Sequence, residues 1–227
     1  MVIRQRAIQA EDKHERHMAI LDAAERLLAR SPDRVANVAE VADEAGLAKG
    51  TVYLYFPSKE ELLLAVHERN VDAFFRALIA RLESPEPAAV HDILALTHRH
   101  IVDVPLFLPL AARCFALMAQ SIPPEAATAF MQRMAARLER AGAGLERHFP
   151  ALPAGGGVVL LRHSYGLING LWQLSASCSG AGPACAAAGA GVRPAPFQWS
   201  YADELDRALV ALWAGTLGPP PRGGAGR

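Results

Sequence analysis

Residues 37–59 read Asn-Val-Ala-Glu-Val-Ala-Asp-Glu-Ala-Gly-Leu-Ala-Lys-Gly-Thr-Val-Tyr-Leu-Tyr-Phe-Pro-Ser-Lys, and this stretch decides the fold. Asn37 is a preferred N-cap residue and precedes apolar residues at helical spacing. Gly46 follows that run, where a glycine in the left-handed conformation commonly ends a helix. A second short helix begins near Ala48 and stops before Pro57, because proline cannot continue a helix. Two short helices joined at a glycine turn predict a helix-turn-helix.

Each of these two helices carries one apolar stripe, which predicts a packed inner face. The stripes consist of Val38, Val41, Ala42, Ala45, Leu47, Val52 and Phe56. The second helix leaves Lys49, Gly50, Thr51, Tyr53 and Leu54 facing outward. The segment 46–59 contains two lysines and no acidic residue, whereas the first 60 residues together hold 9 basic and 10 acidic ones. A lysine, two hydroxyls and a glycine that permits close approach are suited to a DNA groove.

The sequence from about residue 17 to residue 66 resembles the tetracycline-repressor (TetR) family of bacterial transcriptional regulators. The resemblance is carried by Ile20-Leu21-Asp22-Ala23-Ala24, Val41-Ala42, Ala45-Gly46, residues 49–56 and Ser58-Lys59-Glu60-Glu61-Leu62. It implies a three-helix DNA-binding head on an all-α body that binds a ligand and dimerises. By position, the DNA-facing residues that it implies are Lys49, Gly50, Thr51, Tyr53, Leu54, Tyr55 and Lys59. Ala48 departs from the family's usual serine, which removes a side-chain cap and about 1 kcal/mol of helix stability.

Helical signals continue along the whole chain, and no run alternates as a strand does. Proline and glycine breakers divide it into about nine helices, so we expect an all-α fold. Ser58 and Glu61 form a capping-box pattern that starts one long helix, which ends near Leu82. We therefore expect an arm and DNA-binding head over 1–60, a ligand-binding and dimerisation body over 61–217, and a disordered tail over 218–227.

The expected body supplies two sets of candidate residues. A ligand pocket would lie among Phe107, Phe115, Leu117, Met118, Met131 and Met134, although apolar residues at helical spacing are more often plain core. The chain carries no acidic or basic residue between His163 and Val192, and its first half there is apolar on several faces. Such a helix is covered by other helices or by a second copy. The resemblance implies a dimer through the last two helices, with Leu167, Leu171, Leu174, Leu205, Leu209 and Leu212 in the interface.

Composition narrows the class of protein. The 227 residues are 52% hydrophobic and 20% charged, with 23 basic and 23 acidic side chains, so net charge does not indicate a nucleic-acid partner. Three cysteines exclude a disulfide scaffold. The N-terminus lacks the apolar segment of a signal peptide, and no run is long enough to cross a membrane. We therefore expect a cytoplasmic protein with no membrane partner. We also expect a long loop over 177–196.

Patterns for catalysis and metal binding are weak. Ser164 lacks the glycine of a nucleophile elbow, and Gly155-Gly156-Gly157 lacks the lysine of a phosphate loop. Cys178 and Cys185 are too far apart for a zinc knuckle. His91 and His98 share a helix face but are more often ordinary structural residues. We predict no catalytic residue, no metal and no cofactor.

The basic residues before the first helix have two interpretations. Arg4, Arg6, Lys13, His14, Arg16 and His17 belong to a segment that also contains Glu11, Asp12 and Glu15. A basic arm can lie in the minor groove of DNA. A mixed-charge segment can equally be a solvated tail.

The patterns together favour a homodimeric transcriptional regulator, most simply a repressor. It would bind a palindromic double-stranded operator and be released by a small apolar or amphipathic ligand. The alternative is an all-α enzyme or ligand carrier acting on a small apolar molecule. A ligand-independent DNA binder is disfavoured, because nonspecific affinity depends on positive charge that this chain lacks.

Overall fold

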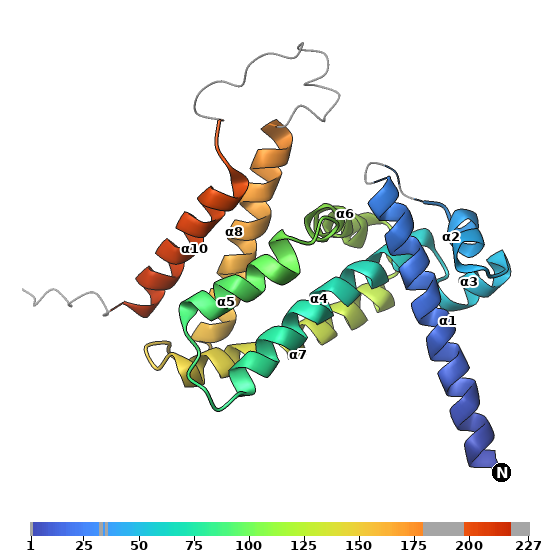
Figure 1. Cartoon of the computed structure of the whole chain (residues 1–227), viewed down its shortest axis with the longest axis horizontal. Helices are drawn as coiled ribbons and strands as arrows, with labels where there is room; N and C mark the ends of the chain where they lie inside the picture. Colours follow the sequence, from blue (N-terminus) through green and yellow to red (C-terminus); the bar gives the residue numbers. More distant parts are fainter. Residues whose placement is uncertain (1, 32–33, 35, 179–197, 219–227) are drawn as a thin grey trace, which may run out of the picture. The chain divides into compact units, whose positions relative to one another are not determined.

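The computed structural model describes residues 2–31, 34, 36–178 and 198–218, except the side chains of residues 2–10, 119, 177 and 178. Within these ranges the chain forms nine α-helices, one π-helical turn and no strand (Figure 1), which confirms the expected all-α fold. The helices are α1 (Val2–Arg30), α2 (Val38–Ala45), α3 (Lys49–Tyr55), α4 (Lys59–Glu83), α5 (Val90–Thr97), the π-helix η1 (His98–Val102), α6 (Phe107–Gln120), α7 (Pro124–His148), α8 (Gly156–Cys178) and α10 (Tyr201–Leu217). Of the tail expected over 218–227, Gly218 is described, as the residue that ends α10, and the rest lies outside the described residues. Of the loop expected over 177–196, residues 177 and 178 belong to α8 instead, and the rest, with Cys185, lies outside the described residues.

The helix ends in the helix-turn-helix follow the local sequence as expected. The Asn37 side chain accepts a hydrogen bond from the Glu40 backbone N–H at 3.0 Å, and the Glu40 carboxylate accepts one from the Asn37 N–H at 2.9 Å. Gly46 adopts the left-handed conformation with φ of 67°, which other residues reach only at a cost. Ala48, at the N-cap of α3, makes no side-chain cap, because a methyl group cannot accept a hydrogen bond. At α4, Ser58 Oγ accepts from the Glu61 N–H at 3.1 Å.

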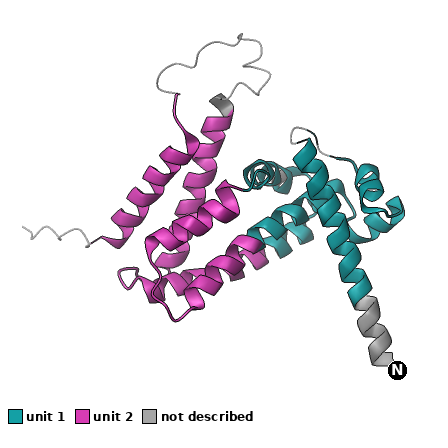
Figure 2. Cartoon of the chain, viewed as in Figure 1, with its two compact units in different colours: residues 1–72, 104–130 teal, residues 73–103, 131–227 magenta. Residues whose placement is uncertain are grey.

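The chain divides into two compact units, shown in different colours in Figure 2. Unit 1 contains residues 1–72 and 104–130, and unit 2 contains residues 73–103 and 131–227. Helix α6 therefore belongs to the same unit as α1, α2 and α3. Helices α4 and α7 each contribute residues to both units. The division at residue 60 that the sequence favours stays a prediction.

Unit 1 has one apolar core that fixes the helix-turn-helix against α1. The core joins side chains of α1, α2, α3, α4 and α6, and consists of Ile20, Leu21, Ala23, Ala24, Leu28, Val38, Val41, Ala42, Val52, Phe56, Leu62, Leu63, Val66, Leu106 and Leu110. Ala45 and Leu47 pack against it while partly buried. The stripes expected from the sequence thus form the inner faces of α2 and α3.

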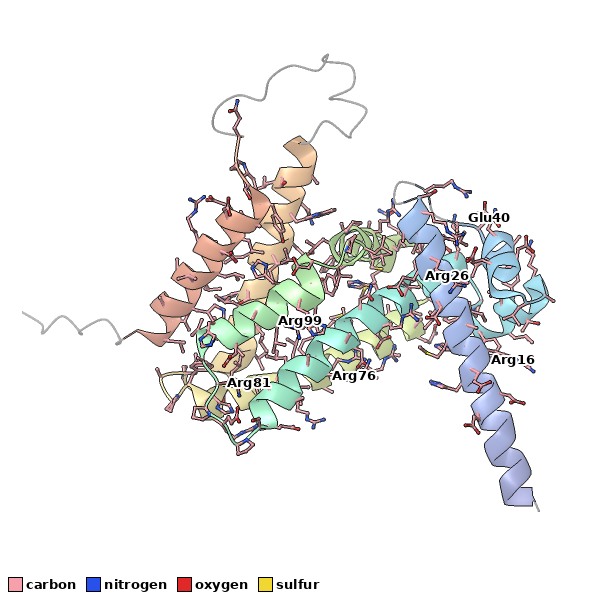
Figure 3. All side chains as sticks on the ribbon, in the orientation of Figure 1. Arg16, Arg26, Glu40, Arg76, Arg81 and Arg99 are labelled. Atoms are coloured by element: carbon pink, nitrogen blue, oxygen red, sulfur yellow. The ribbon has the colours of Figure 1, made fainter. Side chains whose placement is uncertain are left out.

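Ion pairs at the surface of unit 1 connect its helices. Glu44 of α2 forms ion pairs with Arg26 and Arg30 of α1, each at 2.8 Å. Arg26 is labelled on α1 in Figure 3, and Glu40, on the same helix as Glu44, is labelled beside it. Arg69 of α4 pairs with Asp22 and Glu25 of α1 and also donates to the carbonyl of Leu21. Exposed pairs contribute little stability each, so the apolar core, rather than these pairs, holds α1 against the other helices of unit 1.

Unit 2 contains two close helix contacts. Gly157 of α8 lies against the backbone of Gly142 in α7, so closely that a Cβ there would overlap the Gly142 carbonyl oxygen. Helices α8 and α10 lie side by side and antiparallel (Figure 1). The Tyr201 hydroxyl donates to the Ile168 carbonyl at 3.1 Å, and Trp213 Nε1 donates to Ser164 Oγ at 3.1 Å.

Among the described residues, no single helix has both the length and the apolar composition needed to cross a membrane. The α5–η1 segment and α6 meet that test only when taken together as a bent pair.

Candidate nucleic-acid interface

The candidate interface is the outer side of α3, which the packed core of unit 1 holds in place. Lys49, Gly50, Tyr53 and Leu54 are exposed, and Leu54 has 85% of its surface open to solvent. These positions are adjacent along one side of a helix, since residues four apart are neighbours. The Lys49 ammonium lies 5.9 Å from the centre of the Tyr53 ring, and a Cβ added at Gly50 would meet nothing within 4 Å. This side of α3 therefore presents the Lys49 ammonium, the Tyr53 phenol and the Leu54 side chain around Gly50, where the helix backbone is accessible.

The other three expected contact residues lie at the margin of this side. Thr51 is half-buried, and Tyr55 is half-buried with its ring packed against the core of unit 1. Lys59 is exposed and its ammonium lies 3.7 Å from a Glu60 carboxylate oxygen. Tyr55 therefore supports α3 from the inside.

Two of the three acidic side chains of α2, Glu40 and Glu44, are paired with arginines. The pKa of Glu44 is lowered, first by hydrogen bonds from Arg26 and Arg30, and the pKa of Glu40 is lowered by its hydrogen bond with Arg34 and the Asn37 N–H. Both carboxylates therefore stay ionised and paired at neutral pH. Their charge is offset locally, which reduces repulsion of a phosphate backbone near the head.

The segment before the head is helical, and this corrects the expectation of an arm that precedes the first helix. Helix α1 already begins at Val2, and residues 11–16 are exposed along it. An α-helix is about 10–12 Å wide with its side chains, whereas the minor groove is about 6 Å wide. As a helix, this segment does not fit the minor groove.

His17 is also not part of a solvated tail. Its ring lies 4.9 Å from the Phe56 ring and 6.2 Å from the Tyr55 ring, centre to centre. Burial, followed by the charges of His14, Arg69 and Lys13, lowers the pKa of His17. A neutral imidazole therefore packs on the C-terminal end of α3 and helps to hold it.

The expected pocket residues do not share one environment. In unit 1, Phe107 is fully buried with its ring 5.3 Å from the His67 ring, while Leu117 and Met118 are half-buried. Phe115, also on α6, is 56% exposed. In unit 2, Met134 is half-buried and Met131 is 54% exposed. Phe115 and Met131 thus lie at the surface of the single chain, contrary to the expectation that they line its interior.

The expected dimer residues separate into two groups. Leu205 and Leu209 are fully buried within their own chain, on the same side of α10 as Tyr201 and Trp213, which bond to α8. They cannot also contact a partner, so their assignment to the interface is wrong. Leu174 is 58% exposed, and Leu167, Leu171 and Leu212 are partly exposed.

Small and apolar residues are prominent on the exposed surfaces of α8 and α10, which also carry His163 and Arg207. The small and apolar residues include Val159, Gly166, Gly170 and Leu174 of α8 and Val210, Ala211, Ala214 and Gly215 of α10. A Cβ added at Gly166, Gly170 or Gly215 would meet nothing within 4 Å in the single chain. This set is called the small-residue face below.

Two polar residues of α4, one buried and one half-buried, had not been expected. His67 and Asn70 each have a buried nitrogen that finds no hydrogen-bond partner in the described part of the chain. Both follow Leu63 at helical spacing, so they fall on positions where the α4 pattern would place apolar side chains. That interruption of an apolar stripe was the available sequence signal.

The remaining histidine and cysteine candidates have structural surroundings. His98 Nε2 lies 2.6 Å from Asp206 Oδ1, and His91 is exposed beside Asp92. Burial raises the pKa of Cys114 to about 12, so it stays a thiol. Across the part of the chain that the structure describes, no three His, Cys, Asp or Glu side chains gather as a metal ion would need. The side chain of Cys178 lies outside the described residues, as Cys185 does.

Comparisons with known proteins match both parts of the chain. The family described as bacterial regulatory proteins, tetR family, matches residues 20–66, and a tetracyclin repressor-like C-terminal domain matches residues 68–220. A fatty acid metabolism regulator protein of Bacillus subtilis is 34% identical over 88 residues, which are 38% of this chain and 43% of that protein. The transcriptional regulator EthR of Mycobacterium tuberculosis is 41% identical over 71 residues, 31% of this chain and 33% of that protein. The matches thus span less than half of either relative.

A solved structure has a similar arrangement of helices. It is SmeT, described as the repressor of the Stenotrophomonas maltophilia multidrug efflux pump SmeDEF, with a TM-score of 0.54 and 20% sequence identity. The likeness covers 88% of this chain and 89% of that one. At this identity the likeness shows the fold alone.

Proposed function

Because the chain belongs to the tetR family of bacterial regulatory proteins, we propose that it represses transcription as a homodimer bound to a palindromic operator. A small apolar or amphipathic molecule releases it from the DNA. Its relatives are named as transcriptional regulators, which supports this role and supports the view that the chain is not an enzyme. The proposal includes a cytoplasmic location, where the operator is accessible.

The observation that carries the proposal is the exposed side of α3. Lys49 can reach a phosphate or a guanine edge, and the Tyr53 hydroxyl can bond to a phosphate. Gly50 leaves room for the helix to approach the base pairs, and Leu54 can contact a thymine methyl. Capping of α2 and the core of unit 1 hold these groups in a fixed geometry before DNA binds.

A dimer is supported by the small-residue face. Exposed apolar surface on two adjacent helices is costly in water, and glycines allow a second pair of helices to approach closely. A two-fold contact would use the same face on both copies and exclude Leu205 and Leu209. Leu167, Leu171, Leu174 and Leu212 stay in the proposed interface. Two heads can then occupy successive major grooves, about 34–36 Å apart.

The residues that would bind the releasing ligand are taken from the expected pocket. Phe107, Leu117 and Met118 stay candidates for an apolar lining in unit 1, and Met134 stays a separate candidate in unit 2, because each is at least half-buried. A ligand that favours a different spacing of the two heads weakens operator binding, and by linkage operator DNA weakens ligand binding by the same factor.

The alternative of an all-α enzyme or ligand carrier has no specific observation in its favour. Selection of bound sequences from random DNA tests the proposal directly. A palindromic consensus that binds at physiological salt is the expected result. Enrichment of no sequence, or of a single non-repeated half-site, would contradict a two-headed repressor.

A further inference from the structure

We propose that His67 and Asn70 of α4 form the polar end of a ligand site that binds an uncharged carbonyl group on an otherwise apolar molecule. The inference rests on the proposed ligand-released repressor and names the chemistry of its ligand. His67 Nδ1 and Asn70 Nδ2 are both buried, and neither has a hydrogen-bond partner among the residues that the structure describes. Only 3% of the His67 surface is exposed.

The two nitrogens lie on one side of α4. Residues three apart on a helix are neighbours, about 5–6 Å apart at their Cβ atoms. One ligand oxygen between the two side chains can therefore be within reach of both nitrogens.

The surroundings inside unit 1 do not supply a partner. The His67 ring meets the edge of the Phe107 ring, and one turn earlier the Leu63 carbonyl lies 3.9 Å from the Cys114 thiol. These contacts show that α6 runs antiparallel to α4 along this side. Leu63, Leu64, Val66 and Val71 complete the buried apolar residues of α4 around the pair. Buried polar groups are nearly always bonded, so two neighbouring unbonded ones call for a partner from outside the chain.

The chemistry of the two nitrogens selects the partner. The Asn70 amide nitrogen can only donate, so the ligand must present an acceptor oxygen. The neutral His67 ring can place its proton on Nδ1 and donate as well. Burial lowers the pKa of His67 to about 4, with Glu68 opposing weakly, so at neutral pH the ring brings no positive charge. A ketone, ester, lactone or amide fits this site better than a carboxylate, which would be buried without a cation.

The position of the pair links binding to the DNA-binding head. Both nitrogens are covered by side chains of their own chain, so a ligand reaches them only if the packing on α4 opens. Helix α4 also supplies Leu62, Leu63 and Val66 to the core that holds α2 and α3. A ligand inserted beside His67 would therefore change the packing that the head depends on.

The first test measures the ligand-free chain. Asn70→Leu replaces an unbonded amide by an apolar group of similar size, and we expect the thermal midpoint of the full-length protein to rise by a few degrees. The matched control is Thr97→Val, because Thr97 is a buried polar residue whose hydroxyl donates to the Ile93 carbonyl at 2.9 Å, whereas Asn70 is half-buried with an unbonded amide nitrogen. The control should not gain stability. A lower midpoint in Asn70→Leu would mean that the amide is already satisfied, and would overturn the proposal.

The second test uses acetophenone, ethylbenzene and benzoate as probes, because they share a ring and differ in the carbonyl and the charge. NMR titration of the wild-type chain should show acetophenone binding about tenfold more tightly than ethylbenzene, the effect of one or two hydrogen bonds. Benzoate should bind more weakly than acetophenone. The preference for acetophenone should disappear in Asn70→Leu and persist in Thr97→Val. Equal affinities for acetophenone and ethylbenzene, tighter benzoate binding, or no acetophenone binding at millimolar concentration would each overturn the site.

These readouts need no DNA, so they separate the two proposals. A chain that selects a palindrome but shows no carbonyl preference is a regulator without this site. A chain that shows the carbonyl preference and selects no DNA has the site but not the proposed function. If Asn70→Leu fails to fold, the affinities of the wild-type chain for the three probes decide the question.

Discussion

Replacing both glycines of α8 in the small-residue face by alanine tests whether this face is free in solution or is packed closely against a second copy. Gly166 and Gly170 lie in the interior of α8, where glycine is about 0.5–1 kcal/mol less favourable than alanine. Among the described residues, nothing lies within 4 Å of a Cβ added at either position. Gly166→Ala/Gly170→Ala should therefore stabilise the isolated fold by about 1–2 kcal/mol.

The dimer responds in the opposite direction. A two-fold contact meets each glycine twice, so the double variant adds four methyl groups to the closest part of the interface. Overpacking costs about 1–3 kcal/mol, which corresponds to a dissociation constant about 5-fold to 150-fold higher. Unfolding in urea would be measured under conditions where the chain is monomeric, and sedimentation equilibrium would measure the dimer.

The matched control is Gly50→Ala, which adds a methyl group to α3 in unit 1, whereas α8 and α10 belong to unit 2; no described atom lies within 4 Å of that methyl group. It should leave the dimer dissociation constant unchanged. A double variant that dimerises as tightly as the wild-type chain would refute the close approach of two copies through this face.

Three further predictions concern the DNA side, the helix crossing and pH. Lys49→Ala and Tyr53→Ala should each weaken binding to the selected operator by about tenfold or more in fluorescence anisotropy, because each loses a phosphate or base contact; unchanged affinity would remove that residue from the interface. Both should leave the thermal midpoint unchanged, since both side chains are exposed. Gly157→Ala should destabilise the fold by several times the cost of an ordinary surface change, because its methyl group would overlap the Gly142 carbonyl; a midpoint equal to that of the wild type would contradict the crossing. Because the pKa of His67 falls from 6.5 to about 4 on folding, the unfolded state binds the proton first as pH drops. The contribution of His67 to stability should therefore be constant above pH 6.5 and should fall by about 3 kcal/mol between pH 6.5 and 4. Urea titrations measure this loss of stability, and His67→Phe should abolish the part of it that comes from His67.

Features set by short-range contacts could be predicted from the sequence. The Asn37 cap, the Gly46 turn and the Ser58 cap depend on residues within three or four positions, so their identity determines the geometry. The outward side of α3 also followed, because the apolar stripe of Val52 and Phe56 leaves only one side free.

Features set by contacts between distant helices could not be predicted in the same way. Periodicity showed that Leu205 and Leu209 face apolar surroundings, but a stripe does not reveal whether its partner is the same chain or a second copy. The side chains that decide it, Tyr201 and Trp213, bond to α8 and turn this stripe inward. Phe115 was misplaced for the same reason, because α6 buries Phe107 and Leu110 instead.

The helical extension of α1 shows the limit of charge patterns. Glu11, Asp12 and Glu15 alternate with Lys13 and Arg16, which is compatible with a solvated tail and with a charged helix alike. The helix continues from the head because nothing in this segment interrupts it: no proline or glycine occurs before Ser31.

The proposed repressor binds one DNA site with two chains. Sedimentation equilibrium of the wild-type chain with its selected palindromic duplex, at physiological salt and micromolar concentration, measures that stoichiometry directly. The account predicts a complex of two chains per duplex, formed from a dimer that already exists without DNA. One chain per duplex, or a monomer that forms no complex at that salt concentration, would contradict it.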